Sequence, residues 1–478
     1  MIRRLLPLLL LLALLPTSAA AAQPPQLAFF GMNTYITGQE RLGNDRDDGI
    51  ATIVAAGRTA GASWAREEIS WANLESERKG RWNWANMDRR IAQLAAAGYG
   101  ITGMLLTTPA WARVSDCGAR ARAAATQTYW CPPASARDYS DFVWTVVERY
   151  DGDGVMDAPG SPRVAAWQIW NEPSAPLTWP GSPAEYGALL VEGYKAAKSA
   201  DPSAIVATGG VYLFDGLGTD PTDGLHFFDA MIRTVPESRD SFDALAIHPY
   251  MTSAAPDAPK IHASITLWGR ILTAQRWLAA NLRRGERAPR PLWISELGWA
   301  ACTCGQCPPA AVANEQLVAT YLARAHLIAL ALGVQQLSYF QLEDKFDGRD
   351  AGACDDASAI LGTRADGYRQ KPAFVAYRAL VGVLGDARFV GFGAAHRYPF
   401  NPRDQNYIGL YHLRFATPGA TGTTVDALWR TSGSAEVTLP LGGRRAELIA
   451  WDGTVTPLSG TSAKIAVGEQ PQYVRVWK

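Results

Sequence analysis

Residues 86–106 read NMDRRIAQLAAAGYGITGMLL and join a helix to a strand. Apolar residues recur at helical spacing over residues 86–97, and Gly98 follows as a helix stop. Residues 100–106 then form a short apolar run, which is typical of a strand buried on both faces. A helix that leads into a buried strand is the repeating unit of parallel α/β folds, so this stretch predicts one such unit.

The same alternation extends along the chain in both directions. The sequence predicts strands at Ala28 to Met32, Ser63 to Arg66, Gly100 to Leu106, Val164 to Trp170, Ala204 to Gly209, Phe242 to Ile247, Pro291 to Ser295 and Val334 to Phe340. Candidate helices between them are Asp48 to Thr59, Asn86 to Ala97, Ala136 to Tyr150, Ala184 to Ala200, Ile265 to Arg284 and Ala311 to Leu332. This pattern predicts a (β/α)8 TIM barrel with enlarged loops over residues 23–384. A doubly wound open sheet is the alternative, but no glycine-rich phosphate turn follows an early strand.

The pattern changes after about Gly385 to short runs of alternating residues separated by glycine and proline turns. The runs are Leu410 to Phe415, Thr424 to Trp429, Glu436 to Leu439, Ala446 to Trp451 and Tyr473 to Trp477. Period-two alternation predicts a small C-terminal β-sandwich domain over residues 385–478.

The first 22 residues have the order of segments found in a signal peptide. Arg3 and Arg4 precede an apolar run over residues 5–15, and small residues end at Ala22. The apolar run is too short to span a membrane, so we expect cleavage after Ala22 and a secreted or periplasmic protein. The alternative is an uncleaved segment that serves as an anchor.

Composition narrows the function classes. The chain is 48% hydrophobic and 19% charged, which excludes a disordered or collagen-like protein. Its 45 basic and 45 acidic residues cancel, so no bulk charge attracts nucleic acid. We expect no nucleic-acid partner, no membrane partner after signal cleavage, and a monomer.

Export affects the interpretation of the six cysteines, because an oxidising compartment favours disulfides. Cys117 and Cys131 bracket a polar loop and are predicted to bond, which stabilises the fold by about 3 kcal/mol in the loop-entropy model. Two further disulfides, of open connectivity, are predicted among Cys302, Cys304, Cys307 and Cys354. A structural zinc is the alternative, although this cluster lacks the usual paired C-x-x-C spacing.

Two carboxylates follow barrel strands at the edge where active sites form. The fourth strand ends at Trp170-Asn-Glu-Pro173 and the seventh at Ser295-Glu-Leu-Gly-Trp299, which places Glu172 and Glu296 at the mouth of the barrel. Taken singly, each could be a helix-start or solvated loop residue. Together, two facing carboxylates can cleave a glycosidic bond, because the transition state is an oxocarbenium ion.

These motifs resemble those of the clan A retaining glycoside hydrolases, and of family 39-like enzymes in particular. The resemblance covers nearly the whole mature chain. Further matching segments are Ala246-Ile-His-Pro-Tyr250, Gly61-Ala-Ser-Trp-Ala-Arg66 with Trp71, Trp82-Asn-Trp84, Pro109-Ala-Trp111 and Lys371-Pro-Ala-Phe374. The resemblance implies the barrel with its appended sandwich, a carbohydrate substrate and no cofactor.

The resemblance also implies a role for each matching residue. Glu172 is implied as the acid/base and Glu296 as the nucleophile that forms a glycosyl-enzyme intermediate. Substrate-binding or positioning roles are implied for Asn171 on the sugar 2-hydroxyl, Tyr250 and Arg66 on Glu296, and His248, Trp111 and Trp299 in the pocket wall. The physics agrees, since a nearby guanidinium lowers the pKa of a carboxyl group and a tyrosine donates a hydrogen bond.

Some of these residues also have purely structural interpretations. Arg66 could pair with its neighbours Glu67 or Glu68, and His248 could be a satisfied core residue. The chain departs from the family pattern at the end of the eighth strand. There the tryptophan that many relatives place under the sugar is missing, and Phe340 or Tyr339 is the candidate substitute.

One acidic loop is a separate candidate. Asp151, Asp153 and Asp157 occupy positions 1, 3 and 7 of a partial calcium loop, but the downstream glutamate is missing. The alternative is a plain polar loop tightened by glycines. We assign no metal to the catalytic site.

The sequence therefore predicts a retaining O-glycosidase that acts on a poly- or oligosaccharide, with carboxyl groups about 5 to 5.5 Å apart. Residues 112–135 and 211–224 are expected to set specificity. An exo-acting xylosidase or arabinofuranosidase is an alternative within the enzymes. A non-catalytic carbohydrate-binding or envelope protein on a barrel scaffold is the alternative outside them, because a fold alone does not define a function.

Overall fold

The computed structural model describes residues 29–37, 47–213, 223–258, 266–283, 285–301, 312–344, 357–397, 409–417 and 422–477. Three earlier interpretations fall outside these ranges: the signal peptide, the four cysteines from Cys302 to Cys354, and most of the loop 211–224. They stay predictions.

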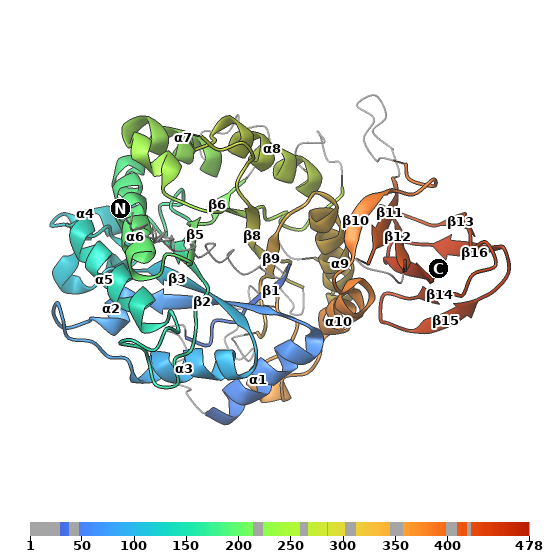
Figure 1. Ribbon diagram of the computed structural model, residues 1–478, viewed down its shortest axis with the longest axis horizontal. Helices are drawn as coiled ribbons and strands as arrows, with labels where there is room; N and C mark the ends of the chain where they lie inside the picture. Colours follow the sequence, from blue (N-terminus) through green and yellow to red (C-terminus); the bar gives the residue numbers. More distant parts are fainter. Residues whose placement is uncertain are drawn as a thin grey trace, which may run out of the picture.

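A parallel sheet forms the centre of the N-terminal part (Figure 1). Its strands are β1 (Phe30–Asn33), β2 (Trp64–Ser70), β3 (Gly100–Leu106), β4 (Ala166–Ile169), β5 (Ile205–Thr208), β6 (Val211–Tyr212), β7 (Leu245–His248), β8 (Leu292–Leu297) and β9 (Gln336–Tyr339). The order is β5-β4-β3-β2-β1-β9-β8-β7-β6. A bridge between Ala207 and Ala244 joins β5 to the segment before β7, so the sheet closes on itself. The predicted barrel is confirmed, and its fifth strand is interrupted by Gly209 and Gly210 before it resumes as β6.

Helices surround this barrel (Figure 1). They are α1 (Asp47–Ala60), α2 (Trp71–Leu74), α3 (Ala85–Ala96), α4 (Cys117–Ala123), α5 (Ala136–Arg149), α6 (Pro183–Ala200), α7 (Gly224–Thr234), α8 (Leu267–Ala280), α9 (Glu315–Ala331) and α10 (Pro372–Leu384). The six predicted helices are confirmed, and α7 adds the helix between the fifth and sixth predicted strands.

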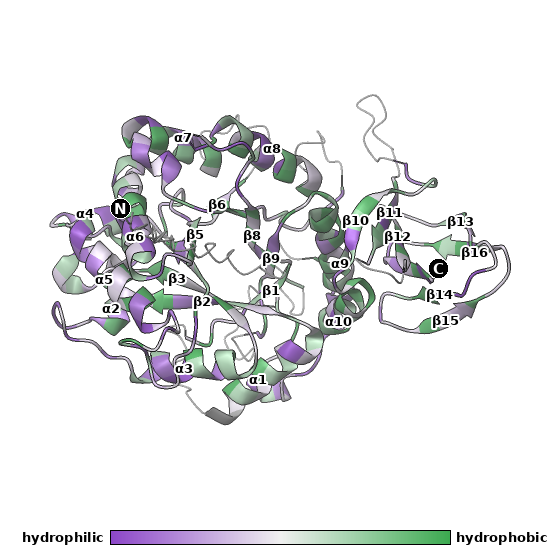
Figure 2. Ribbon diagram, in the orientation of Figure 1, coloured by the Kyte–Doolittle hydropathy of each residue, from purple (hydrophilic) through white to green (hydrophobic). Residues whose placement is uncertain are grey.

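Local sequence explains why these helices form and which face they bury. In α3 the buried residues are Met87, Arg90, Ile91 and Leu94, whose spacing makes one stripe along the helix. Figure 2 shows hydrophilic and hydrophobic residues mixed along α3, α7 and α8, as expected for helices with one buried face. No helix in the described ranges is both long and apolar enough to span a membrane.

The C-terminal part is antiparallel and follows directly on α10. Its strands are β10 (Arg388–Phe392), β11 (Leu410–Ala416), β12 (Thr424–Arg430), β13 (Ala435–Pro440), β14 (Ala446–Ile449), β15 (Val455–Leu458), β16 (Ser462–Val467) and β17 (Gln472–Val476). Six strands form one sheet, β10-β11-β12-β17-β14-β15, and β13 pairs with β16. Leu428 and Val474 of the large sheet share a core with Val437 and Ile465 of the small one, so the predicted sandwich is confirmed.

This sandwich packs against the barrel beside α9 and α10 (Figure 1). Its residues Tyr411, Phe415 and Trp429 belong to the same continuous apolar core as the barrel. A shared core means that the two parts do not meet as separate globules joined by a linker.

Candidate active site

Glu172 lies in a strained turn that directly follows β4. Trp170 and Glu172 have φ values of 66° and 46°, in the left-handed region that non-glycine residues rarely adopt. Thr178 secures the turn, since its hydroxyl donates to the carbonyl of Glu172 at 2.8 Å and its own carbonyl accepts from the Trp170 indole at 2.7 Å. Strain of this kind persists where the surroundings fix a side chain for a function.

Glu296 lies within β8, is 5% exposed, and is surrounded by hydrogen-bond donors. Its Oε1 accepts from Arg66 Nη1 at 2.6 Å and from the Tyr35 hydroxyl at 3.1 Å. Its Oε2 accepts from the Tyr250 hydroxyl at 2.9 Å. The predicted contacts of Arg66 and Tyr250 with Glu296 are therefore present, and Tyr35 adds a third.

These contacts determine the protonation of Glu296. Burial raises the pKa of its carboxyl group, but the nearby His248 and Arg66 and the hydrogen bond from Tyr250 together hold that pKa below its usual value. Burial also raises the pKa of Tyr35 and of Tyr250 well above the usual range, so both hydroxyls keep their protons and donate them. Glu296 is thus an ionised carboxylate at neutral pH, as a nucleophile requires.

Arg66 connects the parts of the site, and its side chain is 1% exposed. Besides Glu296, it donates from Nε to Gln168 at 2.7 Å and from Nη2 to the side-chain oxygen of Asn171 at 2.8 Å. The alternative partner Glu67 is instead bound by the side chains and backbone of residues 34–37. Arg66 therefore fixes Glu296 and Asn171 relative to one another.

A chain of hydrogen bonds runs from Gln168 to Glu172. Because Arg66 donates to Gln168 Oε1, the amide nitrogen of Gln168 faces Ser295 Oγ at 3.2 Å. Ser295 in turn lies 2.9 Å from His248 Nε2, and His248 Nδ1 lies 2.6 Å from Glu172 Oε1. Both ring nitrogens of His248 are therefore occupied, Nε2 by the Ser295 hydroxyl and Nδ1 by the Glu172 carboxyl group, which fixes the orientation of the imidazole.

Two neighbours complete the surroundings of His248 and Glu172. A Cβ on Gly210 would lie 2.0 Å from His248 Nε2, so a glycine there lets the imidazole pack against the backbone. The Tyr212 hydroxyl forms a hydrogen bond with Glu172, and burial raises the pKa of that hydroxyl, so Tyr212 is a donor. The break in the strand between β5 and β6 therefore places Gly210 beside His248 and Tyr212 beside Glu172.

The two carboxylates lie close together. An oxygen of Glu172, an oxygen of Glu296 and a ring nitrogen of His248 all lie within 4.8 Å of one another. Retaining glycosidases have carboxyl groups about 5 to 5.5 Å apart, and inverting ones about 6.5 to 9.5 Å. The spacing of Glu172 and Glu296 agrees with the shorter separation, that of retaining glycosidases.

These three groups also have the chemical types that bind metal ions, but their contacts favour another use. Glu172 Oε1 and His248 Nδ1 bind each other, and both oxygens of Glu296 accept from protein donors. A second acidic trio, Asp151, Asp153 and Asp157, lies in the loop after α5, where Asp151 is buried and Asp153 is exposed. There burial raises the pKa of Asp151 to about 6, and calcium binding stays a prediction.

The predicted aromatic residues occupy different surroundings. Trp111 is half-buried, and its indole donates to the carbonyl of Glu75 at 2.8 Å. Trp299 is 1% exposed, and its indole donates to the carbonyl of Ala254 at 2.9 Å. Contact of either ring with a sugar stays a prediction.

Of the two candidate substitutes at the end of β9, Phe340 is the one whose ring contacts the tyrosines bound to Glu296. Its ring packs edge-on against Tyr35 and Tyr250, with ring centroids 5.8 and 6.3 Å apart. Tyr339 is 1% exposed and lies within the barrel core. Phe340 therefore supports the two tyrosines that donate to Glu296.

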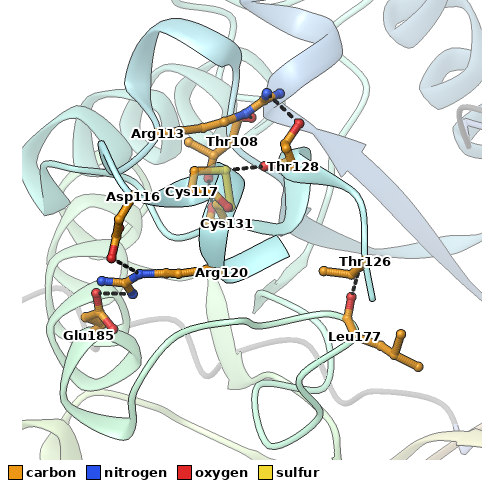
Figure 3. Close-up of a disulfide and its surroundings, with 10 residues drawn as sticks. All are labelled: Thr108, Arg113, Asp116, Cys117, Arg120, Thr126, Thr128, Cys131, Leu177 and Glu185. Atoms are coloured by element: carbon orange, nitrogen blue, oxygen red, sulfur yellow. Dashed lines mark hydrogen bonds and ion pairs between the residues drawn. A yellow bond between two sulfur atoms is a disulfide. The ribbon is translucent and has the colours of Figure 1, made fainter. Parts of the chain in front are cut away.

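The disulfide Cys117–Cys131 is present and braces the loop between β3 and α5 (Figure 3). The same loop contacts the segment after β4, since the Thr126 hydroxyl donates to the carbonyl of Leu177. Arg120 adds an ion pair with Glu185 at 2.7 Å (Figure 3). The predicted specificity loop is thus tied to the segment that carries Glu172.

Sequence reasoning missed four residues of the site, namely Tyr35, Gln168, Tyr212 and Ser295. A signal existed for Gln168 and Ser295, because a polar residue inside an otherwise apolar strand needs a buried partner. Tyr35 follows β1 and Tyr212 is the last residue of β6, and no local sequence pattern distinguishes either tyrosine from a core residue.

No family model matches the sequence, and no curated protein matches it. Solved structures do match. A family 39 glycoside hydrolase from Bacteroides cellulosilyticus WH2 has 19% identity and a TM-score of 0.66, over 91% of this chain and 79% of that one. A monomeric beta-xylosidase from Caulobacter crescentus CB15 has 16% identity and a TM-score of 0.60, over 95% and 97%. An alpha-L-arabinofuranosidase from Thermotoga maritima has 12% identity and a TM-score of 0.61, over 96% and 98%.

Proposed function

We propose that the protein is a retaining glycoside hydrolase that cleaves O-glycosidic bonds in a poly- or oligosaccharide. The proposal is supported by the site described above and by the fold, which resembles solved structures of glycoside hydrolases from families 39, 30 and 51. The observation that carries the proposal is the environment of Glu296. Its carboxylate is held ionised by Arg66 and two tyrosines, within 4.8 Å of a second carboxyl group, Glu172.

The proposed reaction has two displacements. In the first, the Glu296 carboxylate attacks the anomeric carbon, and Glu172 gives its proton to the departing glycosidic oxygen. In the second, Glu172 takes a proton from water, which attacks the same carbon and releases the sugar and Glu296. His248 and Tyr212, which both hydrogen-bond to Glu172, keep that carboxyl group in place through both steps.

Asn171 is positioned to bind the sugar next to the reacting carbon. Its side-chain oxygen accepts from Arg66 Nη2, so its amide nitrogen is free of that contact and can donate to the 2-hydroxyl. Hydrogen bonds to this hydroxyl strengthen in the transition state and stabilise it by several kcal/mol. Arg66 thereby links the nucleophile to substrate recognition.

We further propose export, with residues 1–22 as a cleaved signal peptide. The disulfide Cys117–Cys131 supports an oxidising compartment. Because the solved structures above include a beta-xylosidase and an alpha-L-arabinofuranosidase, xylose- and arabinose-containing polysaccharides are the substrates to test first.

The test measures reducing-sugar release from a panel of plant and bacterial polysaccharides, and 4-nitrophenol release from aryl xylosides and arabinofuranosides. We expect Glu296→Gln to lower kcat by at least about a thousandfold, since the nucleophile is removed. Glu172→Gln should lose more activity on sugar leaving groups than on 4-nitrophenol, which leaves without a proton. Glu192→Gln, an exposed carboxylate of α6 paired with Lys195, is the matched control and should behave as wild type.

The stereochemistry of the first product decides the mechanism. Proton NMR should show the anomer of the substrate. The opposite anomer would replace double displacement by inversion, and equal rates for wild type and Glu296→Gln would remove Glu296 from the reaction. Sugar binding by a wild type that hydrolyses nothing in the panel would favour a non-catalytic binding protein.

A further inference from the structure

Three fully buried side chains join the sandwich to the barrel. Arg324 of α9 pairs with Asp257 at 3.1 Å, and the Trp429 indole of β12 donates to the other carboxylate oxygen of Asp257 at 2.6 Å. All three residues are 0% exposed. Asp257 belongs to the segment that follows β7, so a barrel loop binds a residue of the C-terminal domain.

The sandwich holds its own side of this cluster rigidly. The Trp429 ring stacks on Tyr411 with centroids 4.4 Å apart and an interplanar angle of 5°. Arg324 also donates to the backbone carbonyls of Glu469 and Arg430, at 2.9 and 2.8 Å. Both partners of Asp257 are thus fixed by several contacts with the C-terminal domain.

The segment that contains Asp257 also carries Tyr250, whose hydroxyl binds Glu296. Between these residues the backbone is held at two points. The carbonyl of Tyr250 accepts from Arg270 at 2.7 Å, and the carbonyl of Ala254 accepts from the Trp299 indole at 2.9 Å. Hydrogen bonds therefore hold residues 250–258 at several points between the active site and the domain interface.

A buried carboxylate with two buried donors has few alternative positions. Moving Asp257 would take its carboxylate away from Arg324 inside the core, and breaking a buried ion pair costs several kcal/mol. The cluster therefore restrains the conformation of residues 250–258, and it does so with a donor that only the C-terminal domain supplies.

We infer that the sandwich domain completes the active site: Trp429 and Arg324 fix Asp257, and Asp257 is a positioning residue that directs Tyr250 toward Glu296. This inference rests on the proposed function for its kinetic consequence. In this inference the C-terminal domain positions a residue of the active site without contacting the substrate.

The experiment compares Trp429→Phe with wild type in the full chain. Phenylalanine keeps an aromatic ring on Tyr411 and removes the donor to Asp257. Amide hydrogen exchange is measured on peptides covering residues 250–258, and we expect about tenfold faster exchange there. Trp277→Phe is the matched control, because it removes a similar indole hydrogen bond, to Asp229 at 2.8 Å, between α8 and α7. It should leave exchange over residues 250–258 unchanged.

Kinetics on the aryl glycoside that the wild type cleaves best supply the second measurement. We expect Trp429→Phe to lower kcat by about tenfold with little change in KM, because a misplaced side chain affects the transition state more than substrate binding. The acidic limb of kcat/KM should move to higher pH, since the Tyr250 hydrogen bond helps to hold the pKa of Glu296 low against burial, alongside His248 and Arg66.

A double variant isolates the route through Tyr250. Added to Tyr250→Phe, Trp429→Phe should cause no further loss of kcat, because both changes remove the same contact. Losses that multiply, or exchange over residues 250–258 that stays at the wild-type rate, would overturn the inference. Asp257→Asn is a second variant that keeps the side-chain shape and removes the charge, and it should give the same pattern.

The exchange measurement separates this inference from the proposed function. Faster exchange over residues 250–258 in a chain whose wild type cleaves no glycoside would support the positioning of the loop and refute the enzymatic proposal. If the wild type is active and Trp429→Phe exchanges over residues 250–258 at the wild-type rate, the positioning of the loop is refuted and the enzymatic proposal stands.

Discussion

The ion pair between Arg66 and Glu296 allows the electrostatics of the site to be tested without a substrate. The two atoms lie 2.6 Å apart, and the side chains are 1% and 6% exposed. Arg66→Met removes the cation and keeps an unbranched apolar chain. Removing one partner of a buried pair costs about 3–5 kcal/mol, because the remaining charge is uncompensated.

The other contacts of Arg66 increase this cost. Gln168 and Asn171 each lose a charged donor, and an unsatisfied buried acceptor costs about 1–3 kcal/mol. We therefore expect Arg66→Met to lower the free energy of unfolding by at least about 5 kcal/mol at pH 7. Glu296→Gln removes the charge on the other side. The double variant should be more stable than the sum of the two losses predicts, by about 2–3 kcal/mol.

Urea unfolding followed by tryptophan fluorescence measures the four free energies. The control cycle uses Lys79→Met and Asp138→Asn, whose ion pair has side chains 48% and 30% exposed. Exposed pairs couple by less than about 1 kcal/mol. Both pairs carry opposite charges, but only Arg66 and Glu296 are buried. A larger coupling energy in the Arg66–Glu296 cycle is therefore due to burial.

The dependence of this coupling on pH has a definite sign. The pKa of Glu296 is lowered in the folded protein, so its ionised form contributes stability at pH values above the unfolded pKa of about 4.3. That contribution is lost as the pH falls through the folded pKa. The coupling energy should therefore be full at pH 7 and shrink below about pH 4. Additive losses at pH 7, or a coupling that does not change with pH, would refute the reasoning.

Two further predictions concern other parts of the barrel. Gly210→Ala places a Cβ 2.0 Å from His248 Nε2, so the imidazole must move away from Glu172, and kcat/KM should fall about ten- to a hundredfold. Gly118→Ala, where the nearest contact is 3.5 Å, is the control, and equal kcat/KM for both variants would contradict the prediction. His326 is buried in the core, where desolvation lowers its pKa from 6.5 to about 4, so the wild type should lose about 3 kcal/mol of stability as the pH falls from 6.5 to 4. His326→Leu should remove that part of the pH dependence in urea unfolding, and a wild-type slope in the variant would show that another group titrates.

The sequence by itself determined the architecture, because its signals are local. Helical spacing over residues 86–97 and the apolar run over residues 100–106 predicted α3 and β3, and the same periods recur around the barrel. Glu172 and Glu296 could be found because both follow apolar runs at the mouth-side end of a parallel strand. The pairing of Cys117 with Cys131 likewise followed from spacing and an expected compartment.

The tertiary structure decided which side chains meet. Arg66 binds Glu296, which lies 230 residues away, although Glu67 is its neighbour in the sequence. Tyr35 joins the same carboxylate across 261 residues, and Trp429 reaches Asp257 across 172. The periodicity of a sequence indicates whether a residue faces the core. It does not indicate which residue from a distant part of the chain contacts it there. Closure of the barrel and packing of the sandwich fix those partners, because burial leaves each polar group only the donors and acceptors that the fold brings to it.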